Sequence, residues 1–250
     1  FRFPDGTFAR NRPHPNTLWI DDLYMSVPAL AQIGILKGEK ECFDDAINQL
    51  FQFSERMFCR EIGLFIHGSV SDMKHHPKYF WGRANGWALL AMVELLKVLP
   101  ESYEGRREIS EIFIEHIKGL ARLQSGSGFW HQLLDRQDTY YETSATAIIT
   151  YAFAWAINNG YLDAKEYGPV TILAWNAINS RINSNGQIEG TCVGTGMGFD
   201  PAFYYHRPVS VFAAHGYGPL IMAGSEIIRF IGKYKTGIVE NAFQIYGKNK

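Results

Sequence analysis

The chain has 250 residues, which is enough for one large domain or for part of a larger one. Its 24 Lys and Arg residues nearly balance 25 Asp and Glu residues, and the net charge of -1 argues against binding to nucleic acids or anionic membrane surfaces, because both need a basic excess. No apolar run approaches the roughly 18 residues of a membrane-spanning helix. The 46% of hydrophobic residues can bury a sizeable core.

The cysteine and aromatic contents further limit the class of protein to which the chain can belong. Cys42, Cys59 and Cys192 stand in no CxxC or Cys/His spacing, so we expect neither a disulfide framework nor a metal site. Aromatic residues make up 14% of the chain. This enrichment fits either a ring-rich core or a cleft in which sugar C–H faces stack on Trp and Tyr.

Helical periodicity runs along most of the chain. It predicts helices at about 21–35, 41–58, 82–98, 107–124, 142–159, 166–181 and 213–231. Plausible helix ends support several of these boundaries, such as Gly38 after the first helix and Pro100 after the third.

Short β-like runs that begin with Gly lie between some of the helices, at 63–67, 128–133 and 186–190. They recur about every 60 residues, and a repeat that contains two helices predicts stacked helical hairpins. The hairpins could form an open α-solenoid or a closed ring of six, the (α/α)6 barrel. Closure needs roughly 350 residues. A closed ring would make residues 1–250 a single (α/α)-barrel catalytic domain that lacks its N-terminal helices, and the open solenoid stays the alternative at this point.

The first cluster of chemistry-bearing residues opens the first predicted helix. Asp21 and Asp22 could serve only as helix caps that complement the helix dipole. An adjacent pair exceeds what a cap needs, however, and Trp19 and Tyr24 flank it with sugar-stacking surface. One Asp can therefore cap while its neighbour faces a cavity.

The second cluster contains His67 and Asp72 and then the block 81–87. Arg83 beside Trp81 and Trp87 suits a carboxylate-bearing sugar, through a bidentate guanidinium and ring stacking. The alternative is a buried Arg83 that pairs with one of the first-cluster acids.

The third and fourth clusters follow at the same interval. Glu142 could serve only as a helix cap. On the strand-like run, either His131 or its neighbours, including Trp130, face the cavity.

A glycine-dense segment at 190–198 lacks the Lys-Ser/Thr end of a phosphate loop, so we exclude a nucleotide site. The absence of GxSxG and HExxH gives no support to seryl hydrolysis or zinc proteolysis.

Four blocks together, 19–25, 81–87, 142–147 and 194–216, resemble glycoside hydrolase family 105, the unsaturated rhamnogalacturonyl hydrolases, which are related to the unsaturated glucuronyl hydrolases of family 88. The resemblance spans about residues 17 to 230. It implies an all-α (α/α)6 barrel of helical hairpins with short β-hairpins at one end, and no metal or other cofactor. It also implies a mechanism in which C4 of a 4,5-unsaturated uronyl ring is protonated, water adds at C5, and the resulting hemiketal rearranges and expels the aglycone.

The resemblance implies two catalytic acids. The first matches Asp21. The second belongs to the segment 67–72, where this chain departs from the family by carrying Ser69 in place of an aromatic residue. Asp72 is the only acid of that segment and is our candidate. The expected substrate-binding residues are Trp19, Tyr24, His67, Trp81, Arg83, Asn85, Trp87, Trp130, His131, Glu142, Tyr204, Tyr205, Arg207 and His215.

The expected function is removal of a 4,5-unsaturated uronyl residue from the non-reducing end of an oligosaccharide produced by a lyase. The expected partner is that oligosaccharide, with no nucleic acid and no membrane. Two alternatives are another (α/α)6 carbohydrate enzyme, either a polysaccharide lyase or a sugar epimerase, and a non-catalytic helical-repeat binding protein.

Overall fold

The computed structural model describes residues 1–240 and 242–248. The chain forms two compact units. One contains Phe1–Leu120 and Gly196–Tyr204, and the other contains Ala121–Thr195 and Tyr205–Lys250. Each unit is built mainly from helices.

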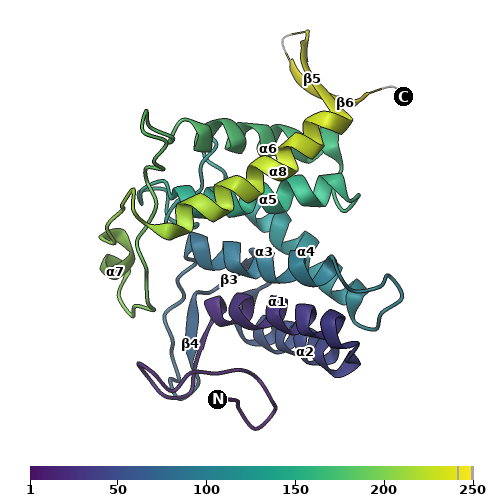
Figure 1. The fold of residues 1–250 in the computed structure, drawn as a ribbon. Coiled ribbons are helices and arrows are strands. Elements are labelled where there is room, and N and C mark those ends of the chain that lie inside the picture. The colour runs from purple at the N-terminus through teal and green to yellow at the C-terminus, as the bar shows by residue number, and fades with distance from the viewer. Residues whose placement is uncertain (241, 249–250) are drawn as a thin grey trace. The chain divides into compact units, whose positions relative to one another are not determined.

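The first unit has four long helices: α1 (Ile20–Lys37), α2 (Lys40–Met57), α3 (Gly82–Leu96) and α4 (Arg106–Ala121). Helix α1 packs against both α2 and α3, as the purple and blue ribbons of Figure 1 show. Its buried residues Leu23, Val27 and Ala31 recur every four positions and form one apolar face. Gly38, at a φ of 70°, ends α1 in the left-handed conformation that glycine tolerates best.

Two short antiparallel strand pairs lie at the ends of these helices. Strand β1 (Thr17–Trp19) pairs with β4 (Gly68–Val70), and β2 (Phe58–Cys59) pairs with β3 (Leu64–Phe65). In the first pair, Trp19 is opposite Gly68. The Ile20 N–H then donates to the His67 carbonyl at 3.0 Å, so the first residue of α1 is tied to the residue before β4.

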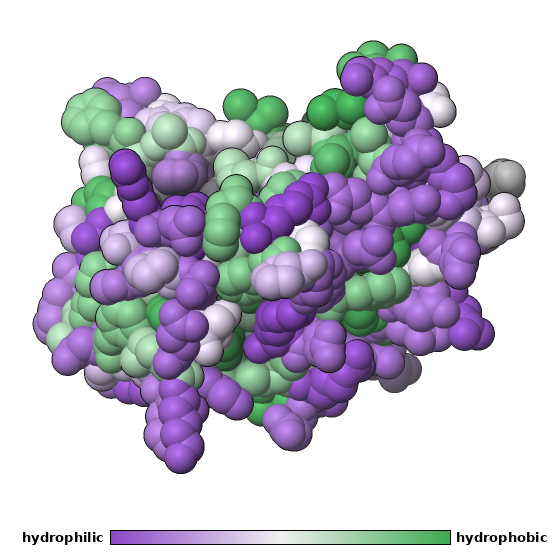
Figure 2. Space-filling model, turned by 90° about the horizontal axis from the view of Figure 1, so that it is seen from below, coloured by the Kyte–Doolittle hydropathy of each residue, from purple (hydrophilic) through white to green (hydrophobic). Residues whose placement is uncertain are grey.

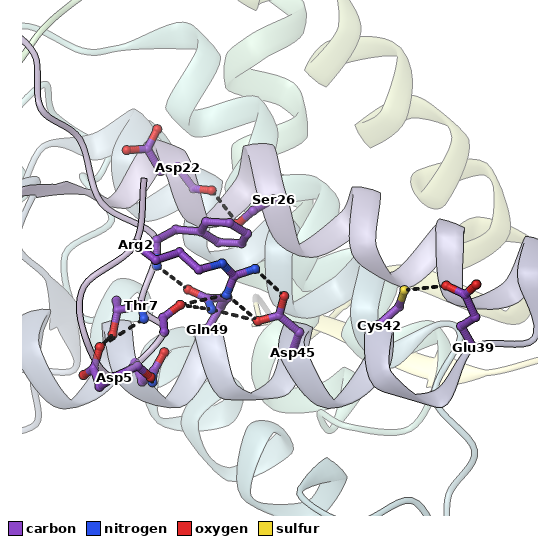
Figure 3. A network of polar contacts seen from close by, with 12 residues as sticks. Arg2, Asp5, Thr7, Asp22, Ser26, Glu39, Cys42, Asp45 and Gln49 are labelled. Atoms are coloured by element: carbon purple, nitrogen blue, oxygen red, sulfur yellow. Dashed lines mark hydrogen bonds and ion pairs between the residues drawn. The ribbon is translucent and has the colours of Figure 1, made fainter.

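The N-terminal segment is anchored to α2 by a network of polar contacts (Figure 3). The Arg2 guanidinium donates to both carboxylate oxygens of Asp45, at 2.9 and 2.6 Å. Gln49 donates to the Gly6 carbonyl and accepts from the Phe8 N–H. These contacts lead the chain along α2 toward Arg10, beside the start of α1.

The second unit is centred on α5 (Thr143–Asn158), all of whose residues are buried. Helices α6 (Ala164–Asn179) and α8 (Tyr217–Lys233) pack against it (Figure 1). Shorter elements of the chain are α7 (Pro201–Tyr205), the 3-10 helix η1 (Ala214–Gly216) and the hairpin of β5 (Tyr234–Val239) with β6 (Ala242–Gly247). An apolar helix of this kind is stable because neighbouring helices cover it.

The all-α class and the positions of all seven predicted helices are confirmed, within a few residues at each end. Of the three β-like runs, 63–67 overlaps β3, whereas 128–133 and 186–190 contribute single bridges, at His131 with Tyr141 and at Ile182 with Ile188. Helix α7 and the terminal hairpin were not predicted. Closure into a six-hairpin ring stays a prediction.

The surface is of mixed polarity. On the face shown in Figure 2, apolar side chains lie in several separate areas among hydrophilic ones, a distribution that is common for folded proteins. Across residues 1–240 and 242–248, no helix combines the length and the apolar character that spanning a membrane requires.

The first prediction concerns the close approach of Gly119 on α4 to the β2–β3 turn. A Cβ at Gly119 would lie 2.5 Å from the Gly63 carbonyl oxygen and 2.6 Å from that of Ile62. Since backbone must move to admit it, Gly119→Ala should lower the free energy of unfolding by about 1–3 kcal/mol in urea titrations. Gly232→Ala is the control, because a Cβ there has no neighbour within 4 Å. We expect it to be neutral or to gain up to about 1 kcal/mol. Equal effects of the two substitutions would contradict this account.

The second prediction concerns His116, which is fully buried and donates from Nε2 to Asn85 Oδ1 at 3.0 Å. Burial lowers its pKa from 6.5 to about 3. Between these pH values the unfolded chain binds a proton that the folded chain does not, so the free energy of unfolding should fall with decreasing pH by up to roughly 1.4 kcal/mol per pH unit. His116→Gln should flatten this slope, measured by denaturant titrations from pH 7 to pH 4. His75→Gln, at an exposed position, should leave the slope unchanged.

Candidate functional site

Asp21, in the first turn of α1, is linked to the interior of the first unit by a chain of hydrogen bonds. His67 Nε2 lies 3.2 Å from Asp21 Oδ2, and His67 Nδ1 lies 2.8 Å from the Tyr204 hydroxyl. The Asp21 side chain is 18% exposed, whereas that of His67 is 1% exposed. Asp21 therefore combines solvent access with a buried, ordered partner, as a reacting carboxyl group requires.

Asp22 has a different partner. The Arg10 guanidinium donates to both of its carboxylate oxygens at 2.6 Å, and the same guanidinium lies 4.0 Å from the centre of the Trp19 ring. Neither acid caps α1 through its side chain, because the N-cap residue is Trp19 and it makes no side-chain capping bond. The expectation that one of the pair caps the helix is therefore wrong. The pair separates because adjacent helical residues point about 100° apart.

The residues of the block 81–87 lie mostly inside the first unit. Trp81 is buried with its ring 4.5 Å from that of His67, and the Arg83 guanidinium lies 4.6 Å from a Trp81 ring. Arg83 is itself only 1% exposed. Arg83 is therefore a buried arginine whose guanidinium lies against the Trp81 ring.

Asn85 is also fully buried, and its bonds explain why. Its amide oxygen accepts from the Phe65 N–H, and its amide nitrogen donates to the carbonyls of Phe65 and Trp81. Asn85 therefore joins the start of α3 to strand β3. We expected Asn85 to contact substrate, but its amide group is instead hydrogen-bonded to backbone groups.

Tyr24 and Trp87 form a stacked pair with ring centres 4.8 Å apart and planes 9° from parallel. Tyr24, on the same face of α1 as Asp21, is half-buried, and Trp87 is buried. Burial raises the pKa of the Tyr24 hydroxyl, with a smaller contribution from Glu94. Trp87 thus supports a half-exposed tyrosine ring one helical turn from Asp21.

Asp72 is not brought to Asp21. Strand β4 begins directly after His67 and runs antiparallel to β1, so each residue beyond His67 lies farther from the start of α1. Asp72, five residues on, lies in the turn that follows β4. It is exposed, accepts a hydrogen bond from Asn16 at 3.0 Å and lines a surface depression with His14 and Phe199. The expectation that these two acids are neighbours is not met.

Glu142 caps α5 in the second unit. Its fully buried carboxylate accepts from the backbone N–H groups of Ser144 and Ala145, and across the unit from Cys192 N–H at 2.8 Å. Gln132 also contacts Cys192, with its Nε2 3.5 Å from Cys192 Sγ. Glu142 therefore acts as a helix cap, which is the alternative stated above. Its additional bond from the Cys192 N–H holds the chain segment around Cys192 against the start of α5.

The strand-like run before α5 places its two candidates differently from one another. Trp130 is fully buried, with its ring 5.8 Å from Phe153 in the core. His131 is 7% exposed, pairs with Tyr141 across a β-bridge, and lies with its ring 4.7 Å from the Tyr141 ring. Its Nδ1 is 2.5 Å from the Thr139 carbonyl.

The remaining candidates of the second unit are half-buried. The Tyr205 hydroxyl lies 3.0 Å from both carboxylate oxygens of Asp138. Arg207 donates to the Gly194 carbonyl and to the Thr195 hydroxyl, so it organises the glycine-dense segment. His215 lies in η1. Tyr204 differs from its neighbour Tyr205 in being fully buried in the first unit.

Two residues that hold candidate side chains in place were not identified from the sequence. Arg10, which holds Asp22, stands in a segment without periodicity or motif, so no sequence signal identified it. Cys192, which joins Glu142 and Gln132, was considered only for metal or disulfide chemistry. Among the residues that the structure describes, no group of three or more His, Cys, Asp and Glu side chains is arranged to hold a metal ion.

Comparison with known proteins adds to this geometry. The family model described as Glycosyl Hydrolase Family 88 matches residues 1–231. The unsaturated 3S-rhamnoglycuronyl hydrolase of Formosa agariphila is 30% identical over 222 residues, which are 84% of this chain and 57% of that protein. The unsaturated rhamnogalacturonyl hydrolase YesR of Bacillus subtilis is 26% identical over 216 residues, which are 86% of this chain and 61% of that protein.

Solved structures agree with the sequence matches. A possible member of the GH105 family from Salmonella enterica is 30% identical and superposes with a TM-score of 0.86, covering 92% of this chain and 62% of that one. The chain thus spans less than two thirds of the relatives described here, and it has the helical-hairpin fold of these helical-barrel enzymes. The resemblance drawn from the four sequence blocks is confirmed, and the chain belongs to Glycosyl Hydrolase Family 88.

Proposed function

We propose that the protein to which this chain belongs is a glycoside hydrolase that removes a 4,5-unsaturated uronyl residue from the non-reducing end of an oligosaccharide. The observation that carries the proposal is Asp21, a partly exposed carboxyl group held by buried His67 beside the half-exposed ring of Trp19. Hydrolases of unsaturated rhamnoglycuronyl and rhamnogalacturonyl substrates among the relatives support this reaction class.

The chemistry that we propose is hydration of the C4=C5 double bond. A proton adds to C4 and a water oxygen bonds to C5, while the proton that this water releases is taken up by a basic group. The hemiketal formed at C5 opens and the aglycone leaves with its glycosidic oxygen. A carboxyl group with solvent access and a fixed hydrogen-bond partner is suited to one of these proton transfers.

Within the first unit, the surroundings of Asp21 fit a sugar ring. Trp19 and Tyr24 are half-exposed aromatic side chains on either side of Asp21 in the chain, and sugar C–H faces pack on such rings. A non-catalytic binding scaffold would not need an acid held by a buried histidine. One solved structure described as a polysaccharide lyase is 28% identical with a TM-score of 0.75, whereas the relatives named above are hydrolases. An epimerase of related fold has no specific observation in its favour.

The third prediction tests the reaction and the role of Asp21. The protein should consume unsaturated rhamnoglycuronyl or rhamnogalacturonyl disaccharides, with loss of the ultraviolet absorbance of the conjugated double bond. Asp21→Asn should lower kcat about 100- to 10,000-fold, the range typical of a lost general acid or base, with little change in unfolding free energy because the replacement is isosteric. Wild-type activity in Asp21→Asn would remove this residue from the mechanism, and inactivity of the wild type on every unsaturated uronide would refute the function.

The fourth prediction separates the two adjacent acids. Asp22→Asn removes the charge that pairs with Arg10, and both side chains are partly exposed, so the cost in unfolding free energy should be at most about 1 kcal/mol. Activity should fall far less than in Asp21→Asn. The paired measurements are kcat and the urea midpoint for both variants, and a larger loss of kcat in Asp22→Asn would reverse the assignment.

A further inference from the structure

The hydrogen-bond chain from Asp21 ends on Tyr204, a residue that lies 137 positions beyond His67 in the sequence. Tyr204 is fully buried, and its hydroxyl lies 2.8 Å from His67 Nδ1 and 3.2 Å from the Gly198 backbone nitrogen. A buried phenol cannot stack on a sugar. Its position instead allows it to act on Asp21 through His67.

The direction of each hydrogen bond follows from the donors. The Gly198 N–H can only donate, so the Tyr204 oxygen accepts there, and its single hydrogen can be given to His67 Nδ1. An Nδ1 that accepts belongs to the tautomer that carries its hydrogen on Nε2. That Nε2–H then points to Asp21 Oδ2, at 3.2 Å, and donates to it.

Packing keeps these groups in place. The His67 ring lies between Trp81, at 4.5 Å, and Tyr204, at 5.6 Å, and its backbone N–H donates to the Tyr79 carbonyl at 2.8 Å. Burial raises the pKa of the Tyr204 hydroxyl. The hydrogen bond from the Gly198 N–H lowers it by less, and the charge of Asp21 adds a still smaller increase. The phenol is therefore a protonated donor at any pH at which the folded protein works.

We propose that Tyr204 is a positioning residue, which fixes the Nε2–H tautomer of His67 and through it orients Asp21, with Oδ2 directed at the histidine. This inference rests on the proposed function, in which Asp21 takes up the proton released by the attacking water. Without the Tyr204 hydroxyl, His67 can adopt the other tautomer. A bare Nε2 then faces the carboxylate, so Asp21 loses the hydrogen bond that holds it in place.

The test compares Tyr204→Phe with Tyr79→Phe in the protein to which this chain belongs. Both remove one buried phenol hydroxyl from the same aromatic group, in which the two rings are 5.0 Å apart, but the Tyr79 hydroxyl donates to the Phe199 carbonyl and not to His67. The first readout is the tautomer of His67, from nitrogen-15 NMR of histidine-labelled protein, with the signal assigned by its loss in His67→Gln. The second is kcat and KM on an unsaturated uronyl disaccharide.

We expect wild type and Tyr79→Phe to show His67 with hydrogen on Nε2 and none on Nδ1. In Tyr204→Phe we expect part of the hydrogen on Nδ1, because the Asp21 carboxylate still accepts from Nε2–H but the hydroxyl that required a bare Nδ1 is gone. We also expect kcat of Tyr204→Phe to fall about tenfold, the effect of losing one buried hydrogen bond, with KM changed less than about twofold. A wild-type tautomer in Tyr204→Phe, or a doubly protonated His67 in the wild type, would overturn the inference.

The two proposals can fail separately. Unchanged kcat in Tyr204→Phe on a substrate that the wild type cleaves would refute the positioning role and leave the proposed function intact. The tautomer shift in a protein that cleaves no unsaturated uronide would refute the function and, with it, the catalytic meaning of the inference. Equal losses of kcat in Tyr204→Phe and Tyr79→Phe would show a packing effect and would also overturn the positioning role.

Discussion

One backbone hydrogen bond, from the Ile20 N–H to the His67 carbonyl, is the constraint on which the arrangement of the first unit depends. It closes the β1–β4 ladder at the residue where α1 begins. The side chains of Asp21 and His67 therefore start from backbone that is already joined. Because a helix N-terminus favours negative charge, the same junction also stabilises an ionised acid in the first turn.

The junction also explains why two adjacent acids have separate surroundings. Asp21 faces the buried His67, whereas Asp22 faces the Arg10 guanidinium, which reaches it because the N-terminal segment is fastened along α2 (Figure 3). Pairing with Arg10 neutralises one of the two like charges. This reduces the repulsion between the two adjacent carboxylates.

The sequence was sufficient to locate the helices, and it failed where long-range contacts decide which residues meet. Periodicity located all seven long helices because their apolar faces are continuous. Asp72 was chosen as the only acid of its segment, but strand direction carries it away from Asp21. The bond between Tyr204 and His67 joins positions 137 residues apart, and no local pattern encodes such a pairing.

The motif residues divide into two groups by how their polar atoms are used. Asn85 and Glu142 are fully buried, and backbone N–H and carbonyl groups occupy their amide and carboxylate, because an unsatisfied buried polar group would cost free energy. They join helix starts to distant segments. Asp21, in contrast, keeps solvent access. The blocks that resemble one family of enzymes thus contain many residues with structural roles. The residues that a sugar can reach in each unit are the partly exposed members, which are Trp19, Asp21 and Tyr24 in the first unit and Tyr205, Arg207 and His215 in the second.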